Sequence, residues 1–193
     1  MFSFFSRRED PVLDGPFVRH HDNGAKREEG VYTSGRRHGL WRRWYEDGTP
    51  EEECTYVEGH LHGPVTRWYP TGQLRAEFDL CWGAMHGPFA RFHPNGRLAE
   101  EGEWIDGHPH RAYCRWWPNG HRRIEGPFHH GQPVGRWRAW SPDGSIVWDG
   151  EWVEGLEEAL HGELKSAIRL GEPDPAVTTL EREAWEGDYG NVA

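Results

Sequence analysis

The chain has 193 residues, a formal net charge of −10, 25 glycines and 12 tryptophans. Only 35% of its residues are apolar and its mean hydropathy is −0.91, so glycine and aromatic residues must replace an aliphatic core. No apolar stretch approaches the length of about 20 residues that a transmembrane helix needs. Cys54, Cys81 and Cys114 form no Cys-x-x-Cys pair, which argues against a disulfide framework or a zinc site and indicates a reducing compartment.

Residues 1–10 are predicted to be a leader ahead of the folded part. The apolar residues 1–5 are followed, not preceded, by Arg7 and Arg8, and they are too few for the apolar region of a signal peptide. Without an export signal, we expect a cytoplasmic protein.

Residues 11–155 are predicted to form an array of similar units, because glycine recurs every 24 residues in three registers. A repeat of this length is typical of arrays in which each unit buries its apolar face only against its neighbours. Function is therefore sought in columns of equivalent positions. The registers are Gly35, Gly59, Gly83, Gly107, Gly131 and Gly155; Gly24, Gly48, Gly72, Gly96, Gly120 and Gly144; and Gly15, Gly39, Gly63, Gly87 and Gly135, with Arg111 at the one gap.

Each unit predicts two strands, a tight turn between them and a wider turn to the next unit. Residues 39–45 and 50–57 are the strands of one unit, and residues 58–62 contain its wider turn. Tight turns such as residues 94–96 suit a three-residue loop with a glycine bulge, because proline presets the first position and glycine accepts a positive φ. The pairs that this loop places opposite each other are Trp68 and Leu74, Phe92 and Leu98, and Trp140 and Ile146.

The predicted fold class is mainly β: an elongated single-layer antiparallel meander of about six 24-residue β-hairpin repeats, with a short C-terminal helical tail. The tail, residues 156–193, has nine acidic residues against three basic ones, a net charge of −6 that leaves −4 for residues 1–155. Leu156, Leu160 and Leu164 recur in it at helical spacing. We expect the tail to cap the exposed edge of the last strand, with docking onto a partner protein as the alternative.

Strand alternation predicts that the columns of Trp44 and Tyr56 share one face of the sheet. Small residues such as Gly30 and Cys54 lie between these ring columns, so the rings can cover bare backbone. We expect this face to be the core, and a binding site is the alternative.

The other face is predicted to carry the columns of Trp41, Arg43 and Glu53. Its arginines and acids form either a structural ladder of cross-strand ion pairs or a recognition stripe for an acidic partner. The candidate partner-binding residues on this face are Trp41, Arg43, Tyr45, Arg67, Tyr69, Phe89, Arg91, Arg115 and Trp137.

The sequence indicates no catalytic or metal centre and no cofactor. Four successive repeats carry a histidine at the same position, but equivalent positions on successive hairpins should be about 10 Å apart, too far to share a zinc ion. His60 with His62, and His108 with His110, could chelate a metal locally, although solvated turn residues are the simpler interpretation. No nucleophile, base and orienting group can be assembled, so we expect no enzyme. The histidine column is His38, His62, His86 and His110.

Arginine interleaved with tryptophan could stack single-stranded nucleic acid, but the array's net charge of −4 opposes phosphate binding. The same charge opposes association with an anionic membrane. A protein partner is therefore the expectation, and the oligomeric state is left open.

The unit Gly-x-x-x-Gly-x-Trp-x-x-Trp-Tyr-x-x-x-Gly, followed by an acid and an aromatic residue, resembles the MORN-variant repeat, in particular the arrays of the bacterial YwqK-family antitoxins. The resemblance covers residues 11–155 and is closest in residues 35–56 and 83–104. It implies a hairpin array that binds another protein, with a toxin as the namesake partner and no catalytic residues. Arg111, Val134 and the tail depart from the pattern.

Together these observations predict a non-enzymatic repeat protein that binds a protein partner. An antitoxin or immunity-like factor that neutralises a toxin is the specific form that the resemblance implies. The alternative is a structural scaffold or a membrane- or lipid-associated MORN-type module.

Overall fold

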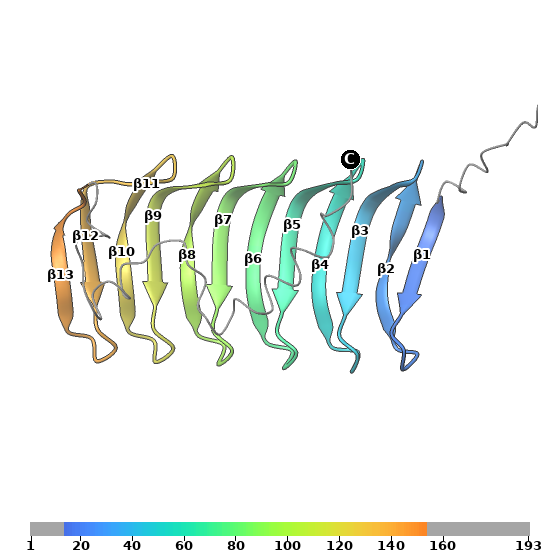
Figure 1. Cartoon of the computed structure of the whole chain (residues 1–193), viewed down its shortest axis with the longest axis horizontal. Helices are drawn as coiled ribbons and strands as arrows, with labels where there is room; N and C mark the ends of the chain where they lie inside the picture. Colours follow the sequence, from blue (N-terminus) through green and yellow to red (C-terminus); the bar gives the residue numbers. More distant parts are fainter. Residues whose placement is uncertain (1–13, 154–193) are drawn as a thin grey trace, which may run out of the picture.

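A computed structural model describes residues 14–153, which form one open antiparallel sheet of 13 strands (Figure 1). The predicted leader, residues 1–10, and the predicted helical tail, residues 156–193, lie outside the described residues. The strands are β1 (Gly15–His20), β2 (Lys26–Thr33), β3 (Arg36–Trp44), β4 (Pro50–Val57), β5 (His60–Trp68), β6 (Leu74–Cys81), β7 (Ala84–Phe92), β8 (Leu98–Ile105), β9 (His108–Trp116), β10 (Arg122–His129), β11 (Gln132–Pro133), β12 (Arg136–Trp140) and β13 (Ile146–Glu151).

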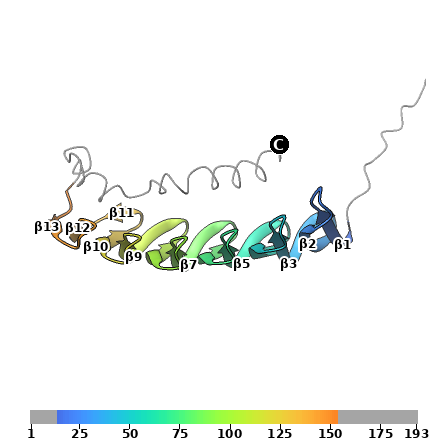
Figure 2. The same ribbon diagram turned by 90° about the horizontal axis from the view of Figure 1, so that it is seen from below.

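The strands pair in chain order, except that β12 lies beside β10. The order runs from β1 to β10 and then to β12 and β13, while the two-residue β11 pairs with β10. Figure 2 looks along the strands and shows a single layer, and no helix occurs between residues 14 and 153. The predicted single-layer meander is therefore confirmed.

The tight turns have the predicted form. The Tyr69 amide donates to the Gln73 carbonyl at 2.8 Å and the Gly72 amide donates to the Tyr69 carbonyl at 2.8 Å, which leaves residues 70–72 as the loop. Gly72 has a φ of 79°, as the glycine bulge requires. The three predicted cross-strand pairs, Trp68–Leu74, Phe92–Leu98 and Trp140–Ile146, are all present.

The turn between units is tighter than expected. Val57 pairs directly with His60, so only Glu58 and Gly59 form the loop, and both have positive φ values of 52° and 86°. This is the geometry of a two-residue type I′ hairpin. The prediction of a wider turn is wrong because residues 60–62 extend the next strand.

The predicted assignment of columns to faces is wrong in half of each unit. Trp41 pairs with Cys54 and Arg43 with Glu52, but the register shifts between Arg43 and Trp44, which pairs with Pro50. This bulge inserts Glu51 as an extra residue on β4. Counting alternation outward from the tight turn therefore places every β4 side chain on the opposite face from its true one.

We call the face that carries Trp41, Arg43, Cys54, Tyr56 and their equivalents the core face. The opposite face, with Arg42, Trp44, Glu53 and their equivalents, is the outer face. Trp41 and Tyr56 thus lie on the same face, and Glu53 lies on the other.

The core face consists of aromatic rings packed over glycine backbone. Trp41 is 1% exposed and contacts the rings of Phe17, Tyr32 and Tyr56 at centroid distances of 5.7, 5.1 and 6.0 Å. A Cβ atom on Gly30 would lie 2.2 Å from the Trp41 ring. The expectation that rings cover small residues is confirmed, but the covering rings belong to the Trp41 column and not to the Trp44 column.

A second aromatic cluster fills the same face at the other end of the sheet. Trp137 is fully buried and contacts Phe128 at 5.1 Å and Trp152 at 5.3 Å between centroids. A Cβ atom on Gly126 would lie 2.0 Å from the Trp137 ring. Glycine is therefore required at the two points where a tryptophan ring approaches the backbone most closely.

Hydrogen bonds link successive repeats along both rows of turns, at the two ends of the strands. On the tight-turn edge the Tyr45 hydroxyl donates to the Trp68 carbonyl at 2.8 Å, and the Trp117 indole donates to the Trp140 carbonyl at 2.9 Å. On the other edge the Gly83 amide donates to the Leu61 carbonyl at 2.8 Å. Each bond joins nearest neighbours only, as expected for a linear array.

Candidate functional site

All nine predicted partner-binding residues lie on the core face. Trp41 and Trp137 are buried, as are Tyr69 and Arg115, which are 8% and 4% exposed. The other five are partly buried: Arg43, Tyr45, Arg67, Phe89 and Arg91. The structure thus brings the nine residues together on one face and gives them packing roles, while their contact with a partner stays a prediction.

The arginine column pairs with a different acid from the one predicted. Arg67 Nε lies 2.6 Å from Glu52 Oε2, and Arg91 Nη2 lies 2.6 Å from Glu100 Oε2. Glu53 belongs to the column of acids that was expected to pair with these arginines. It instead accepts a hydrogen bond from Arg42 on the outer face at 2.8 Å. The bulge at residue 51 explains the correction, because it moves the preceding acid onto the arginine face.

Glu100 is the centre of a buried polar network. It accepts from Arg91 and from the Tyr113 hydroxyl, at 2.5 Å, and lies 4.0 Å from Arg115. Burial, together with the nearby Glu100 charge, raises the pKa of Tyr113 well above its usual value, so its hydroxyl stays a donor. The network is a structural element of the core face.

The outer face carries a second, solvent-exposed ladder of ion pairs. Arg42 contacts Glu53 at 2.8 Å and Glu29 at 3.7 Å. Near the other end, Arg138 contacts Asp149 at 3.3 Å and Glu125 at 3.8 Å. In the middle repeats the arginine is replaced by shorter side chains, Thr66, Ala90 and Cys114.

The outer face also holds an accessible column of aromatic rings. The Lys26 ammonium lies 5.2 Å from the centroid of the Trp44 ring and 2.6 Å from Glu29, which places Trp44 beside the outer ion pairs. This column was expected to be core, but its rings remain partly exposed, whereas Trp41, Val65, Tyr113 and Trp137 of the Trp41 column are buried. The partly exposed rings are Trp44, Trp68, Phe92, Trp116 and Trp140.

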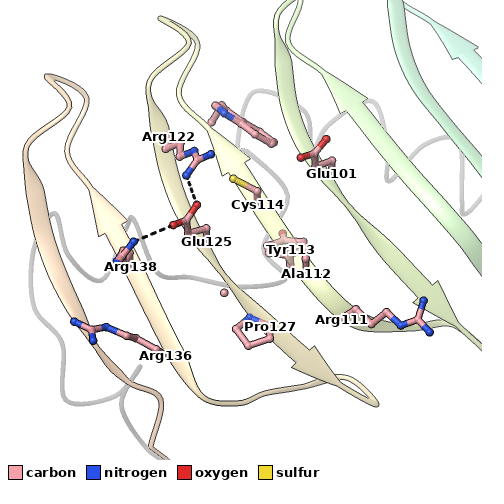
Figure 3. Close-up of a pocket in the computed structure, with 12 residues that line it drawn as sticks. Glu101, Arg111, Ala112, Tyr113, Cys114, Arg122, Glu125, Pro127, Arg136 and Arg138 are labelled. Carbon is pink, nitrogen blue, oxygen red and sulfur yellow. Dashed lines mark hydrogen bonds and ion pairs between the residues drawn. The ribbon is translucent and has the colours of Figure 1, made fainter.

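A groove of about 730 Å³ crosses the outer face over β8, β9, β10 and β12 (Figure 3). Small residues line its middle, among them Ala112, Cys114 and Pro127. The equivalents of Ala112 and Cys114 are Leu40 and Arg42 in the second repeat, so the groove exists where two longer side chains are missing. Its longer side chains are Glu101, Arg111, Tyr113, Trp116, Arg122, Glu125, Arg136 and Arg138.

The arginines around the groove are held by acids. Arg122 and Arg138 both contact Glu125, at 2.5 and 3.8 Å, and Figure 3 shows their side chains converging on it. Arg136 donates to Asp149 at 2.6 Å, and this hydrogen bond lowers the pKa of the Asp149 carboxyl, which is therefore ionised at neutral pH. The result is a fixed pattern of positive and negative groups beside an indole ring.

The groove holds no activated nucleophile. Burial raises the pKa of the Cys114 thiol to about 12, so the thiol is protonated near neutral pH. Arginine and tryptophan around a small apolar floor are instead typical of protein-binding hot spots.

Sequence reasoning missed the groove, although a signal for it existed. Two adjacent columns of the array show a loss of side-chain volume in the middle repeats that ends after Ala112 and Cys114. The columns are Leu40, Pro64, Pro88, Ala112 and Arg136, and Arg42, Thr66, Ala90, Cys114 and Arg138. Reading that loss as a groove also required knowing which residues share the outer face.

The predicted histidine column lies near the two-residue turns, together with His129 and His130. The His110 ring lies 5.4 Å from His129 and 5.0 Å from His130, while His62 packs 5.1 Å from the exposed Trp82. Within residues 14–153, no three histidine, cysteine or acidic side chains are arranged to hold a metal ion. The three cysteines are free. This part of the chain, residues 14–153, also contains no helix that is long and apolar enough to cross a membrane.

One family model matches part of the repeat array. The model of the MORN repeat variant matches residues 37–58, 61–79 and 85–106, which confirms the MORN-type resemblance for three of the repeats. No curated protein matches the sequence. A solved structure of an S. aureus TarM mutant, in complex with fondaparinux, alpha-GlcNAc-glycerol and UDP, aligns at 10% identity with a TM-score of 0.32. That alignment covers 50% of this chain but only 19% of the TarM chain.

Proposed function

We propose that this chain is a non-enzymatic repeat protein that binds a protein partner through its outer face. The observation that carries the proposal is the groove at β8–β12, bordered by Arg122, Arg136, Arg138 and the partly exposed ring of Trp116. The regular sheet supports it, because rigid strands present these groups at fixed positions.

The chemistry of the groove favours protein over nucleic acid. Its arginines alternate with Glu101, Glu125 and nearby Asp149, whereas a phosphate backbone requires a basic surface. Mixed charges around aromatic anchors instead suit a partner surface with complementary polar groups.

The specific form of this proposal is a cytoplasmic antitoxin or immunity-like factor that neutralises a toxin. It is supported by the resemblance of the repeat unit to the YwqK-family arrays. The alternative, a structural scaffold or a membrane- or lipid-associated module, is supported by the elongated shape and the MORN-type repeats.

Filling the groove tests the proposed surface. The double variant Ala112→Leu/Cys114→Arg introduces the residues that the second repeat already accommodates as Leu40 and Arg42. The matched control, Pro64→Leu/Thr66→Arg, introduces the same two residues at the equivalent positions of the third repeat. Tagged full-length proteins are used to capture partners from the source cells, and bound proteins are quantified by mass spectrometry.

We expect a partner that the wild type and the control retain and that the groove-filling variant loses by at least about tenfold, as for the loss of a hot spot. Equal capture by all three proteins would remove the groove from the proposal, and no specific capture would argue against partner binding. Co-expression with the product of a neighbouring toxin-like reading frame then tests the antitoxin form, through rescue of growth. Flotation with anionic vesicles tests the membrane alternative.

A further inference from the structure

We propose that the acidic C-terminal segment, residues 154–193, docks along the core face of its own chain. The docking site is the arginine row, which we define as the arginines that lie on alternate strands from β1 to β9: Arg19, Arg43, Arg67, Arg91 and Arg115. This inference does not depend on the partner proposed for the outer face.

The arginine row carries more positive than negative charge. Within the described residues, four glutamates contact the row: Glu28, Glu51, Glu52 and Glu100. Ala76 stands opposite Arg67 and Ile124 opposite Arg115. Five arginines therefore share four glutamates. Glu28 illustrates the sharing, because it contacts both Arg19, at 3.3 Å, and Arg37, at 2.8 Å.

A second line of arginines reinforces the row at the bulge positions. Arg75 and Arg123 take the place that Glu51 holds in the second repeat. Their guanidinium groups lie 5.9 Å from the Tyr69 ring and 4.5 Å from the Trp117 ring. The core face thus combines cations with aromatic rings, which suits a segment that carries both carboxylates and apolar side chains.

This positive charge is local to the core face. Residues 14–153 hold 17 basic and 20 acidic residues, a net charge of −3. An acidic segment that approached the sheet at random would be repelled overall, whereas one that lies along the arginine row meets an excess of cations.

The C-terminal segment has the complementary chemistry. Residues 154–193 contain ten acidic and three basic residues, a net charge of −7. Apolar residues recur in it at a spacing of about four, as Leu156, Leu160 and Leu164, so in a helix they would form one stripe that could face the rings of the core face.

Length and attachment also match. Twelve strands in line at a spacing of about 4.8 Å extend over about 55–60 Å. The 40 residues of the segment reach about 60 Å even at the helical rise of about 1.5 Å per residue, and further where Gly171, Pro173 and Pro175 interrupt a helix. The segment continues directly from β13, where Trp152 packs on the core face at 5.3 Å from Trp137. Attachment to the same chain gives it a high effective concentration over that face.

Limited proteolysis of the full-length chain tests the proposal. Trypsin cleavage after Arg169 is followed by mass spectrometry, because cleavage requires the segment to leave the sheet. The variant Glu154→Gln/Glu157→Gln/Glu158→Gln removes three negative charges from the segment without changing the sheet. The variant Arg67→Gln/Arg91→Gln weakens the row, and Arg136→Gln/Arg138→Gln removes two arginines from the outer face as the matched control.

We expect both the segment variant and the row variant to be cleaved about fivefold faster than the wild type, while the outer-face control is unchanged. Salt of about 0.5 M should accelerate cleavage of the wild type, because it screens the attraction. Circular dichroism shows which variants keep the sheet, and the segment variant decides the outcome if the row variant unfolds.

Equal cleavage of the wild type and the segment variant would overturn the proposal. It would also be overturned by a concentration-dependent dimer in light scattering whose dissociation accelerates cleavage, since the segment would then dock on a second copy.

Discussion

The two faces of this sheet carry the same kinds of residue and differ in what water can reach. On the core face Trp41 is 1% exposed and the side chain of Glu28 is 2% exposed, whereas on the outer face the paired side chains of Arg42 and Glu53 are 45% and 44% exposed. The bulge near each tight turn decides which acid joins which face. The comparison shows that, in a single-layer sheet, position relative to the bulge determines whether an ion pair belongs to the core or to the surface.

This difference has an energetic consequence. An exposed ion pair stabilises a fold by about 0–1 kcal/mol, whereas leaving a buried charge without its partner costs several kcal/mol. The same kind of substitution should therefore lower the free energy of unfolding much more on the core face than on the outer face.

The largest effect is expected from removing a core-face tryptophan. Trp137→Ala should lower the free energy of unfolding by about 3–5 kcal/mol, because the fully buried ring packs on Phe128 and Trp152 and covers Gly126. Trp140→Ala, three residues away on the outer face, should cost about 1–2 kcal/mol, because its ring is partly exposed. Urea denaturation followed by circular dichroism compares the two, and equal losses would contradict the assignment of faces.

The next largest effect is expected from breaking the polar network at Glu100. Glu100→Gln should cost about 2–3 kcal/mol, because Arg91 and the buried Arg115 lose their shared carboxylate. The outer-face counterpart, Glu53→Gln, should cost less than about 1 kcal/mol. High salt should reduce the cost of Glu53→Gln in the free energy of unfolding, because it screens exposed charges, and should leave the cost of Glu100→Gln nearly unchanged. The same denaturation experiment, repeated in high salt, measures both costs. Similar costs for the two variants would mean that the Glu100 network is open to solvent.

A smaller difference in stability is expected between alanine substitutions at two glycines that lie under aromatic rings. Gly126→Ala should cost about 1–3 kcal/mol, because its Cβ would lie 2.0 Å from the Trp137 ring and the ring cannot move without leaving its pocket. Gly102→Ala should cost less, since the nearest atom is Trp104 Cζ3 at 2.9 Å, on a partly buried side chain. Thermal unfolding of the two variants checks the order, and equal costs would contradict the close approach of the Trp137 ring to the Gly126 backbone.

The sequence was sufficient for the architecture but not for the faces. Its period of 24 predicted the meander, and the proline and glycine of residues 70–72 predicted the tight turn and the Trp68–Leu74 pair. The bulge was not predictable, because its position holds Glu51, Arg75, Ala99, Arg123 and Val147 in successive repeats, without the glycine that marks a bulge in sequence. One undetected extra residue then inverted the alternation on half the strands and hid the outer-face groove, although the shortening at Ala112 and Cys114 was visible in the sequence.

The smallest effect concerns the one repeat that departs from the glycine pattern, and it should be stabilising. Arg111 keeps a φ of 64°, in the left-handed region where Gly39, Gly63 and Gly87 have 69°, 96° and 104°. A non-glycine residue there costs about 1 kcal/mol, and its exposed ion pair with Glu103 at 3.0 Å returns less than that. Arg111→Gly should therefore raise the free energy of unfolding by about 0.5–1 kcal/mol. Arg111→Ala removes the same ion pair and keeps the strain, so it should not stabilise. If alanine stabilises as much as glycine, backbone strain is not the cause, and the charge of Arg111 at the groove would be the destabilising feature.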